Sequence, residues 1–390
     1  MNNPHFKFMM KHFLTRTEKS HDESDKILDE NIEAVKKELD SFLIDSLEKD
    51  GHSNFSTGVF SDKENESMMV DIIDDDETEI DQHVEKFNDK STSLIDSVLD
   101  KSEISFFQYH SPLDRLEEYA DSILPYMLEK ERRFMPDPFY MTNQANINSK
   151  MRSILVDWLV DVADEYNIKD ETLFLTVNYI DRFLSKVSIS RQEFQLLGTA
   201  ALFVASKYEE IYPPEIGEFV YITDDSFTKQ QILQMEKLIF TVLEFDVSVP
   251  TSNYFLEKYL SDLSLGKEVY CLSKYLCFLS MLECQPFLKF YPSEIALCSI
   301  LLAAKSLNVF EEIPTEFIRN TLNYERSLDS NGDIDQFLAD RNILIEELNK
   351  LHLFAKEHPQ QVIQRKYSSS KYYKVAGIGA GSSEISISTK

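Results

Sequence analysis

The chain has 390 residues and a formal net charge of −28, which results from 68 Asp and Glu side chains against 40 Lys and Arg. This length suggests two domains or more, and the acidic balance argues against a nucleic-acid-binding surface, because phosphate neutralisation requires clustered Lys and Arg. The sequence shows neither a secretory signal nor an apolar run long enough to span a membrane, so we expect a soluble protein in a reducing, intracellular compartment.

Residues 1–110 differ in composition from the rest of the chain. Acidic residues outnumber basic ones there by more than two to one, so about half of the net charge lies in this stretch. Ser, Asn, Asp and Glu dominate, and one helix is predicted, from about Asp25 to Leu47. Such a composition cannot bury enough apolar surface to offset the conformational entropy of the chain, so we predict a mostly disordered, acidic regulatory tail.

From Ser111 onward the apolar residues recur at helical spacing, and the predicted fold class is all-α. Pro250 marks the boundary between two helical domains. The segments Ala201–Lys207 and Ser299–Lys305 resemble each other about one domain length apart, which favours duplication over a chance similarity of Ala-rich helices. The first predicted helices run from Leu113 to Arg132, Ser149 to Tyr166, Thr172 to Leu184, Arg191 to Tyr208 and Thr228 to Leu243.

The predicted helix from Ser149 to Tyr166 has more apolar surface than one core contact requires. Its apolar positions form two stripes at helical spacing. The first consists of Leu155, Leu159 and Val162. The second consists of Met151, Ile154 and Trp158. Two interpretations are open: the helix is central to a bundle and buried on all sides, or its second stripe receives a partner.

Two ionisable residues lie inside the apolar faces of neighbouring predicted helices. Arg152 falls within the apolar arc of the helix that begins at Ser149, and Asp181 falls within the core face of the next helix. A buried charge without a partner costs several kcal/mol. We therefore predict a structural ion pair between Arg152 and Asp181.

A second pair of opposite charges allows two interpretations. Lys207 ends a helix rich in small residues, and Glu236 lies on the apolar side of another helix. The two side chains either pair with each other, or both belong to an apolar-rimmed surface where fixed charges set the register of a bound partner.

No motif indicates chemistry performed by the chain itself. The four cysteines have spacings that match no zinc or redox pattern, so we predict free, mostly buried thiols at Cys271, Cys277, Cys284 and Cys298. The sequence has no phosphate-binding loop, no metal-spaced cluster and no nucleophile motif. We expect no catalytic site, no metal and no cofactor.

Four motifs follow one another along the chain: Met151–Leu155, Asn178–Leu184, Ala205–Glu215 and Phe219–Asp225. Together and in this order they resemble the cyclin box of A-type cyclins. The similarity extends from about Tyr119 to Tyr373. It implies two tandem five-helix cyclin folds at residues 148–247 and 248–365, preceded by an N-terminal helix and linker at 111–147 and followed by a C-terminal tail at 366–390.

The resemblance also implies a partner. A cyclin is a non-catalytic regulatory subunit that binds and activates a cyclin-dependent Ser/Thr protein kinase, here in S phase or at the G2–M transition. The alternatives are a B-type mitotic cyclin, or a transcription or scaffold protein of the same fold. By match to the family, the kinase-binding positions are Lys207, Glu236, Val204, Tyr208, Phe240, Phe245, Tyr119, Ile123 and Tyr126.

The second stripe matches the groove in which A-type cyclins bind Arg-x-Leu peptides of substrates and inhibitors. The resemblance implies an apolar floor, a carboxylate for the arginine of the peptide, and an amide that hydrogen-bonds the peptide. The matching residues are Met151, Ile154, Trp158, Asp161, Phe194 and Gln195. The family commonly has Glu at the position of Asp161 and Leu at that of Phe194, so the peptide preference is expected to differ.

The acidic tail contains the tripeptide Lys63-Glu64-Asn65. On a cyclin this KEN sequence resembles a degron, which implies recognition by a ubiquitin ligase of the anaphase-promoting type. We expect the protein in the nucleus and the cytoplasm, with no nucleic-acid or membrane partner.

Overall fold

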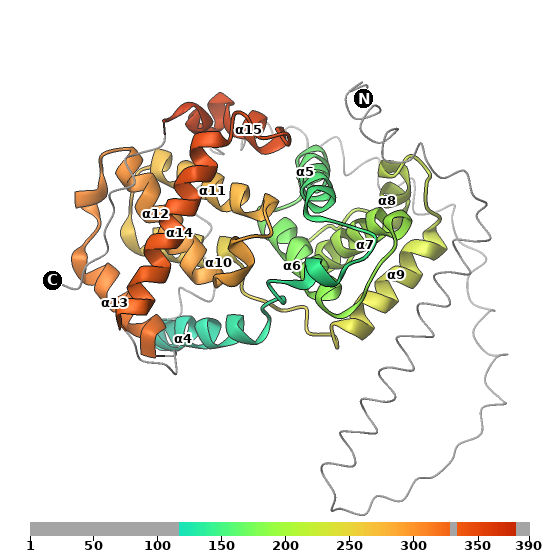
Figure 1. The fold of residues 1–390 in the computed structure, drawn as a ribbon, viewed down its shortest axis with the longest axis horizontal. Helices are drawn as coiled ribbons and strands as arrows, with labels where there is room; N and C mark the ends of the chain where they lie inside the picture. Colours follow the sequence, from blue (N-terminus) through green and yellow to red (C-terminus); the bar gives the residue numbers. More distant parts are fainter. Residues whose placement is uncertain (1–116, 328–333, 380–390) are drawn as a thin grey trace, which may run out of the picture. The chain divides into compact units, whose positions relative to one another are not determined.

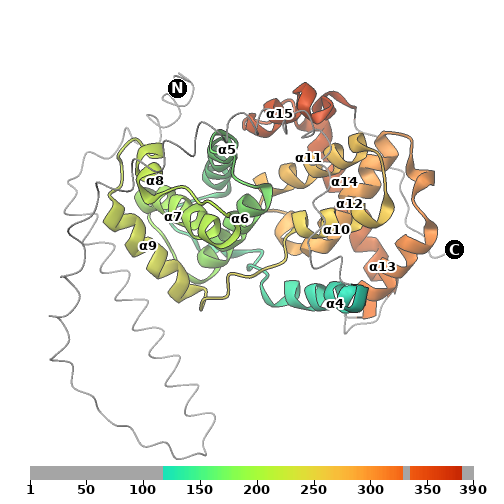
Figure 2. The same cartoon turned by 180° about the vertical axis from the view of Figure 1, so that it is seen from behind.

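The computed structural model describes residues 117–327 and 334–379, and these residues form helices and loops with no β-strand. Two groups of five helices, here named the first bundle and the second bundle, lie at opposite sides of Figure 1, and the view from behind in Figure 2 shows the same separation. The prediction of an all-α protein with two tandem five-helix domains is confirmed. The first bundle consists of α5 (Ser149–Glu165), α6 (Asp170–Lys186), α7 (Arg191–Glu209), α8 (Ile216–Ile222) and α9 (Lys229–Val242). The second consists of α10 (Ser252–Leu263), α11 (Lys267–Leu282), α12 (Pro292–Ser306), α13 (Thr315–Ser327) and α14 (Ile334–Phe354).

Helices α5, α7 and α9 begin where side chains supply acceptors for backbone N–H groups of the first turn. Asn148 caps α5 by accepting a hydrogen bond from the amide of Met151. Ser190 and Glu193 form a capping box at the start of α7, and Thr228 and Gln231 form one at α9. Because these caps satisfy N–H groups that have no partner within the helix, they fix the starts of the three helices.

The third helix of each bundle is its central element. In the first bundle α7 packs against all four other helices, and in the second α12 packs against α10, α11 and α14. The segments Ala201–Lys207 and Ser299–Lys305 lie on these two helices, so the internal sequence similarity falls at equivalent places. A Cβ atom at Gly198 of α7 would come within 2.8 Å of a Leu155 methyl group on α5. Glycine is therefore what allows these two helices to approach so closely.

Two further helices extend the second bundle. Helix α4 (Glu117–Arg133) lies beside it in Figures 1 and 2, and the Glu131 carboxylate accepts hydrogen bonds from the amide and hydroxyl of Ser293 at the start of α12, at 2.9 and 2.6 Å. At the other end of the chain, α15 (Val362–Tyr367) packs against both α5 and α11.

The region from residue 366 onward differs from the predicted C-terminal tail. Up to residue 379 it continues the fold through two short 3-10 turns, Ser370–Tyr372 and Val375–Gly377. Tyr367 and Val375 are fully buried, and Tyr367 packs its ring against that of Tyr372. The reason is apolar burial, because these side chains close the end of the second bundle. The predicted boundary of the second domain is thus too early.

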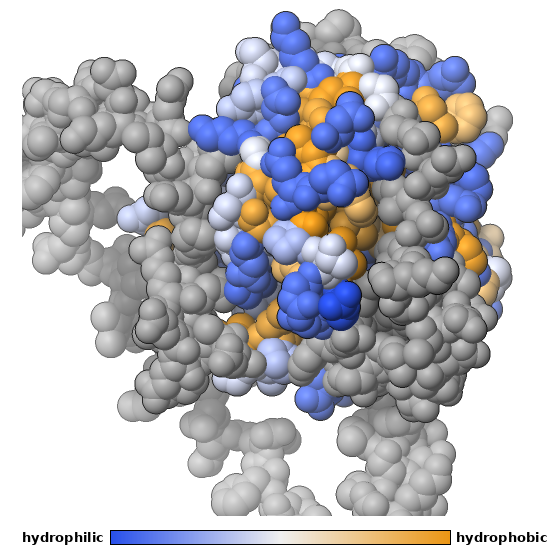
Figure 3. All heavy atoms as spheres, turned by 90° about the vertical axis from the view of Figure 1, so that its left-hand side faces the viewer, coloured by the Kyte–Doolittle hydropathy of each residue, from blue (hydrophilic) through white to orange (hydrophobic). Residues whose placement is uncertain are grey.

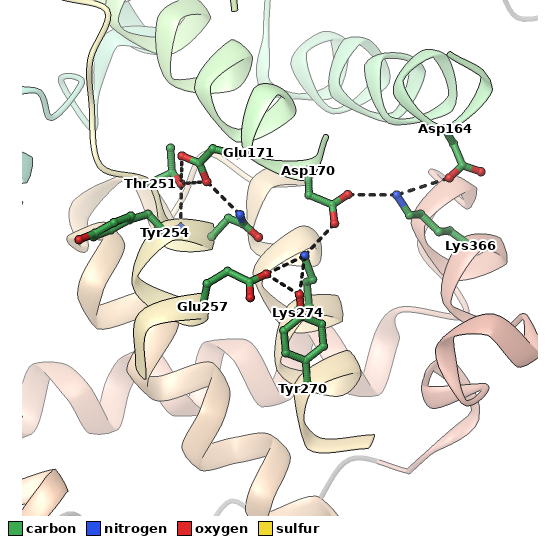
Figure 4. A network of polar contacts seen from close by, with 10 residues as sticks. Asp164, Asp170, Glu171, Thr251, Tyr254, Glu257, Tyr270, Lys274 and Lys366 are labelled. Atoms are coloured by element: carbon green, nitrogen blue, oxygen red, sulfur yellow. Dashed lines mark hydrogen bonds and ion pairs between the residues drawn. The ribbon is translucent and has the colours of Figure 1, made fainter. Parts of the chain in front are cut away.

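Charged and polar side chains join the two bundles (Figure 4). Glu171 on α6 accepts hydrogen bonds from the Thr251 hydroxyl at 2.8 Å and from the Asn253 amide at 2.9 Å. Its neighbour Asp170 pairs with Lys274 of α11 at 2.8 Å and with Lys366 of α15 at 3.3 Å. The start of α6 is therefore tied to the second bundle by two adjacent carboxylates.

Apolar side chains also reach the surface of the second bundle. Figure 3 faces the end of this bundle and shows hydrophobic side chains in a central band that hydrophilic ones border. Among the described side chains of α14, residues 341–354, the large apolar ones that are exposed are Ile343, Leu353 and Phe354. Within residues 117–327 and 334–379, no helix combines the length and the apolar character that crossing a bilayer requires.

Candidate functional site

Arg152 and Asp181 form the ion pair that the sequence predicts. Arg152 donates through Nε and Nη2 to the two carboxylate oxygens of Asp181, at 2.7 and 2.6 Å, and the two side chains are only 1% and 3% exposed. The Tyr140 hydroxyl donates a third hydrogen bond to the same carboxylate at 2.7 Å. This bidentate geometry satisfies both charges in a dry environment.

The same guanidinium reaches the second bundle. Arg152 Nη1 donates to the carbonyl oxygen of Met281 at 2.7 Å, and the neighbouring Ser153 hydroxyl donates to that of Leu282, also at 2.7 Å. Both carbonyls lie at the last turn of α11, where backbone acceptors have no partner within the helix. The start of α5 thus supplies the hydrogen bonds that complete α11, and this part of the site holds the two bundles together.

Lys207 at the end of α7 and Glu236 on α9 form an ion pair with each other. The Lys207 side chain is 41% exposed and that of Glu236 only 11% exposed. The Lys207 ammonium also lies 4.2 Å from the centre of the Phe203 ring, within range of a cation–π interaction. The pairing interpretation is therefore correct for the isolated chain, while the exposed half of Lys207 leaves the partner interpretation open.

Aromatic side chains lie on or next to the two helices that carry this ion pair. Tyr208 is 47% exposed, and the Phe240 and Phe245 rings stack with their centres 5.1 Å apart. Phe245 is 73% exposed and has a positive φ of 61°, as does its neighbour Glu244 with 56°. A bulky residue adopts this conformation only where the surrounding structure imposes it, which is typical of functional surfaces. We name Lys207, Tyr208, Glu236, Phe240 and Phe245 the aromatic surface.

The other positions that the resemblance assigns to kinase binding differ in how far their side chains are exposed. Val204 is 1% exposed, so it supports the aromatic surface from within. On α4, Tyr126 is 56% exposed with the Lys130 ammonium over its ring, and Ile123 is partly exposed. The side chain of Tyr119 lies outside the described part of the structure.

The predicted docking residues come from two adjacent helices, α5 and α7. Phe194 and Gln195 are buried on α7. Met151 and Trp158 are each 5% exposed on α5, whereas Ile154 and Asp161 are partly exposed. Helix α5 is therefore buried on most of its circumference, and the second stripe is open mainly at Ile154. We name these six residues the docking face.

Trp158 carries a polar atom that the described residues leave without a partner. Its indole Nε1 is buried, and no acceptor from residues 117–327 or 334–379 reaches it. An unsatisfied buried donor destabilises a fold by about 1–3 kcal/mol. Such a group needs an acceptor from outside the described residues, which a water molecule or a bound ligand can supply.

Asp161, the predicted acceptor for a peptide arginine, has a neighbour that sequence reasoning missed. Arg365 of α15 places Nη2 at 3.8 Å from Asp161 Oδ1. Burial raises the pKa of the Asp161 carboxyl, and the Arg365 guanidinium opposes that rise. The two residues are 204 positions apart and share no periodic pattern, so only the three-dimensional fold reveals the contact.

Ile211 and Tyr212 form a second feature that sequence reasoning missed. They are 78% and 92% exposed in the loop between α7 and α8. Two prolines follow them directly, and because proline disrupts the interior of a helix, α7 has to end before this loop. The two prolines therefore predict a surface loop. Exposed apolar side chains in such a loop are typical of a site that contacts another protein.

The remaining predictions concern cysteines, metals and the tail. Cys271, Cys277, Cys284 and Cys298 are free and buried, as predicted. Among the described residues, no group of His, Cys, Asp and Glu side chains is arranged to hold a metal ion. The acidic tail, its helix at Asp25–Leu47 and the KEN tripeptide lie outside the described residues.

Comparison with protein families identifies both bundles. Residues 122–248 match the model for the cyclin N-terminal domain, and residues 250–380 match that for the cyclin C-terminal domain. The second match begins at Pro250.

Curated relatives give the same result. The G2/mitotic-specific cyclin-A of Patella vulgata is 44% identical over 278 residues, which cover 70% of this chain and 62% of that protein. Cyclin-A1 of Homo sapiens is 43% identical over 286 residues, covering 73% of this chain and 58% of that protein. Cyclin-A2 of Gallus gallus is 40% identical over 286 residues, covering 73% and 68%. The chain spans only about six-tenths of the length of the first two relatives. With both bundles matched and these relatives in common, the chain belongs to the cyclin family, in its A-type group.

Proposed function

We propose that the chain is the regulatory subunit of a cyclin-dependent Ser/Thr protein kinase and controls progression through S phase and the G2–M transition. The observation that carries this proposal is the aromatic surface, where the exposed rings of Tyr208 and Phe245 lie on or next to the helices that carry the Lys207–Glu236 ion pair. Soluble monomers rarely expose such clusters, and aromatic residues are enriched where proteins meet. The names of the A-type relatives, two of which are cyclins A1 and A2, support the same assignment.

The proposed mechanism is a shift of population in the kinase. An active kinase needs its catalytic lysine paired with a glutamate on a mobile helix and its activation segment ordered. A rigid partner that binds only this arrangement favours it over the inactive one. In this proposal the chain contributes binding energy and performs no chemistry itself.

The test is the double variant Lys207→Ala/Glu236→Ala. It removes the charges that set the register of the partner, so we expect less kinase in affinity purification and less histone-type phosphorylation. The matched control is Lys258→Ala/Asp262→Ala, which removes an ion pair of α10 in the second bundle and should leave both readouts unchanged. Undiminished kinase recovery and activity in the Lys207/Glu236 variant would contradict the proposal.

We further propose that the docking face binds Arg-x-Leu peptides of substrates and inhibitors. The supporting observation is the buried indole N–H of Trp158, because an extended peptide offers a carbonyl oxygen for each residue. Ile154 would contact the leucine of the peptide, and Asp161 its arginine.

Two variants of Trp158 test this docking proposal. Trp158→Phe keeps most of the apolar volume but removes the N–H donor, so we expect peptide affinity to fall several-fold with kinase binding retained. Trp158→Ala should abolish peptide binding and likewise retain the kinase. Joint loss of peptide and kinase would indicate misfolding, and full peptide affinity in both variants would contradict the docking proposal.

The acidic tail suggests control of abundance. We propose that the KEN tripeptide is recognised by a ubiquitin ligase of the anaphase-promoting type, and that the protein acts in the nucleus and the cytoplasm. Replacing Lys63, Glu64 and Asn65 with Ala should lengthen the half-life in mitosis, measured after translation is blocked. An unchanged half-life would remove the degron from the proposal.

The alternatives are a B-type mitotic cyclin and a transcription or scaffold protein of the same fold. Affinity purification followed by mass spectrometry separates them, because a kinase subunit recovers a kinase and a transcription factor recovers a polymerase. A kinase assay with and without the chain then shows whether the recovered enzyme depends on it.

A further inference from the structure

The acidic side of α5 faces α15. Three carboxylates at i, i+4 and i+7 point to this helix, those of Asp157, Asp161 and Asp164. They meet a backbone amide, a guanidinium and an ammonium. These partners belong to Val362, Arg365 and Lys366. The helix that carries most of the docking face thus has its charged side covered by the C-terminal part of the same chain.

Two of these three contacts are fixed. Asp157 is buried and accepts the amide of Val362 at 3.0 Å. Lys366 is only 8% exposed and lies between Asp164, at 3.5 Å, and Asp170, at 3.3 Å (Figure 4). Breaking the first contact would leave the buried Asp157 carboxylate without its backbone donor, and Lys366 is held in place by Asp170 as well as by Asp164, so neither partner on α15 is free to move away at low cost.

The third contact differs in both distance and exposure. Arg365 and Asp161 are 3.8 Å apart, and their side chains are 59% and 37% exposed. An ion pair of this kind is weak, because water and salt screen it and two flexible side chains must be ordered to form it. A ligand cation can therefore displace Arg365 without unfolding anything else.

We propose that Arg365 competes with the arginine of a docking peptide for the carboxylate of Asp161, and so lowers the selectivity of the docking face for basic peptides. This inference rests on the docking role proposed above. A peptide guanidinium gains the carboxylate only when Arg365 moves away, and the two cations repel each other at close range. Asp161 offers a single carboxylate on a short side chain to both the Arg365 guanidinium and the arginine of the peptide. The apolar residue of the peptide then contributes more to affinity than its arginine does.

The test is peptide binding to the full chain, measured by fluorescence anisotropy. One labelled peptide contains Arg-x-Leu, and the other contains citrulline in place of arginine, which keeps the shape and removes the charge. The variants are Arg365→Gln, which removes the competing cation, and Arg365→Glu, which replaces it with a second carboxylate. The matched control, Arg319→Gln, removes the same charge from α13, where Arg319 pairs with Glu316 of its own helix away from α5.

Arg365→Gln is expected to tighten binding of the arginine peptide by about two- to five-fold, the range of an exposed charge pair, and Arg365→Glu by more. The citrulline peptide should bind Arg365→Gln as it binds the parent, and Arg319→Gln should change neither affinity. In an Asp161→Asn background the gain from Arg365→Gln should disappear, because the shared acceptor is gone.

The outcomes separate the two proposals. If the arginine peptide binds the parent and Arg365→Gln leaves its affinity unchanged or weaker, the docking role stands and the competition is wrong. If neither peptide binds the parent or any Arg365 variant, the docking role fails and the competition fails with it. A gain of the same size for the citrulline peptide would show that Arg365 acts by covering the surface instead of by charge.

Discussion

Arg152 shows how one buried side chain can serve two parts of a protein. Its guanidinium binds the carboxylate of Asp181 within the first bundle and the carbonyl of Met281 in the second. Arginine suits this position because its planar group presents several donors in fixed directions and stays charged when buried.

Removing the carboxylate should therefore be costly. In Asp181→Ala, Arg152 stays buried with a carbonyl as its remaining acceptor, and we expect the free energy of unfolding to fall by about 3–5 kcal/mol, the usual penalty for breaking a buried pair. Urea denaturation of the full chain measures this difference. Glu316→Ala is the control, because it breaks an exposed pair with Arg319 and should change stability by less than about 1 kcal/mol. Equal stabilities of the two variants would contradict the structural role.

At the scale of residues, periodicity predicts charges that face the core but not the partners that come from distant segments. Arg152 and Asp181 fall inside apolar faces of consecutive helices, so their pairing follows from the pattern. Met281 contributes a backbone carbonyl oxygen, which any residue type could supply. Arg365 lies on α15, 204 residues after Asp161 in the sequence. No pattern near either residue in the sequence predicts these contacts. The burial of Trp158 and Met151 depends likewise on helices packed around α5.

Helices α5, α7 and α9 of the first bundle begin where a side chain caps them. The capping box of Thr228 and Gln231 fixes the start of α9, the helix that carries Glu236 and Phe240 to the aromatic surface. A change at this cap should act on the whole helix.

We expect Thr228→Ala to lower the free energy of unfolding by about 1 kcal/mol, because the Gln231 amide in the first turn loses its acceptor. Thr241→Ala on the same helix is the matched control. Its hydroxyl donates back to the carbonyl of Lys237, and alanine is the better helix former, so no loss is expected there. Chemical denaturation monitored by circular dichroism distinguishes the two. A loss in Thr241→Ala as large as that in Thr228→Ala would show that the cap has no special role.

At the scale of elements, strong caps and long apolar periodicity make boundaries predictable. The predicted helices Arg191–Tyr208 and Thr228–Leu243 correspond to α7 and α9 within one residue at each end. Helix α8 has only seven residues, too few to show a period, and it was not predicted as a helix. The 3-10 turns after Tyr367 have no helical period either, which is why the sequence assigns them to a tail.

Between the bundles, Glu171 is a carboxyl whose pKa is shifted toward neutrality. Burial raises its pKa to about 7, although Asn253 and Thr251 donate hydrogen bonds that oppose the rise. A carboxyl with a raised pKa favours the folded state at low pH, and this contribution is lost as pH rises from about 4.5 through about 7. Its neighbour Asp170 behaves in the opposite sense, because Lys274 and Lys366 outweigh the effect of burial and hold its pKa at about 2.

Glu171→Gln should remove this pH dependence while it keeps an acceptor for Thr251 and Asn253. We expect the variant to equal the parent near pH 4.5 and to exceed it by about 1–2 kcal/mol at pH 8, less than the full shift implies because the side chain keeps some contact with water. Denaturation of both proteins across this range measures the difference. Parallel curves for the parent and the variant would contradict a carboxyl that titrates near neutrality.

The contacts between the two bundles, and those of α15 with α5, determine how the molecule unfolds. Arg152 and Ser153 complete the last turn of α11, and α15 packs back onto α5, so each bundle supplies contacts that the other needs. Neither can lose its structure without removing partners from buried groups of its neighbour. Heating should therefore produce a single cooperative transition in calorimetry, with equal van't Hoff and calorimetric enthalpies, although the chain contains two domains of the same fold.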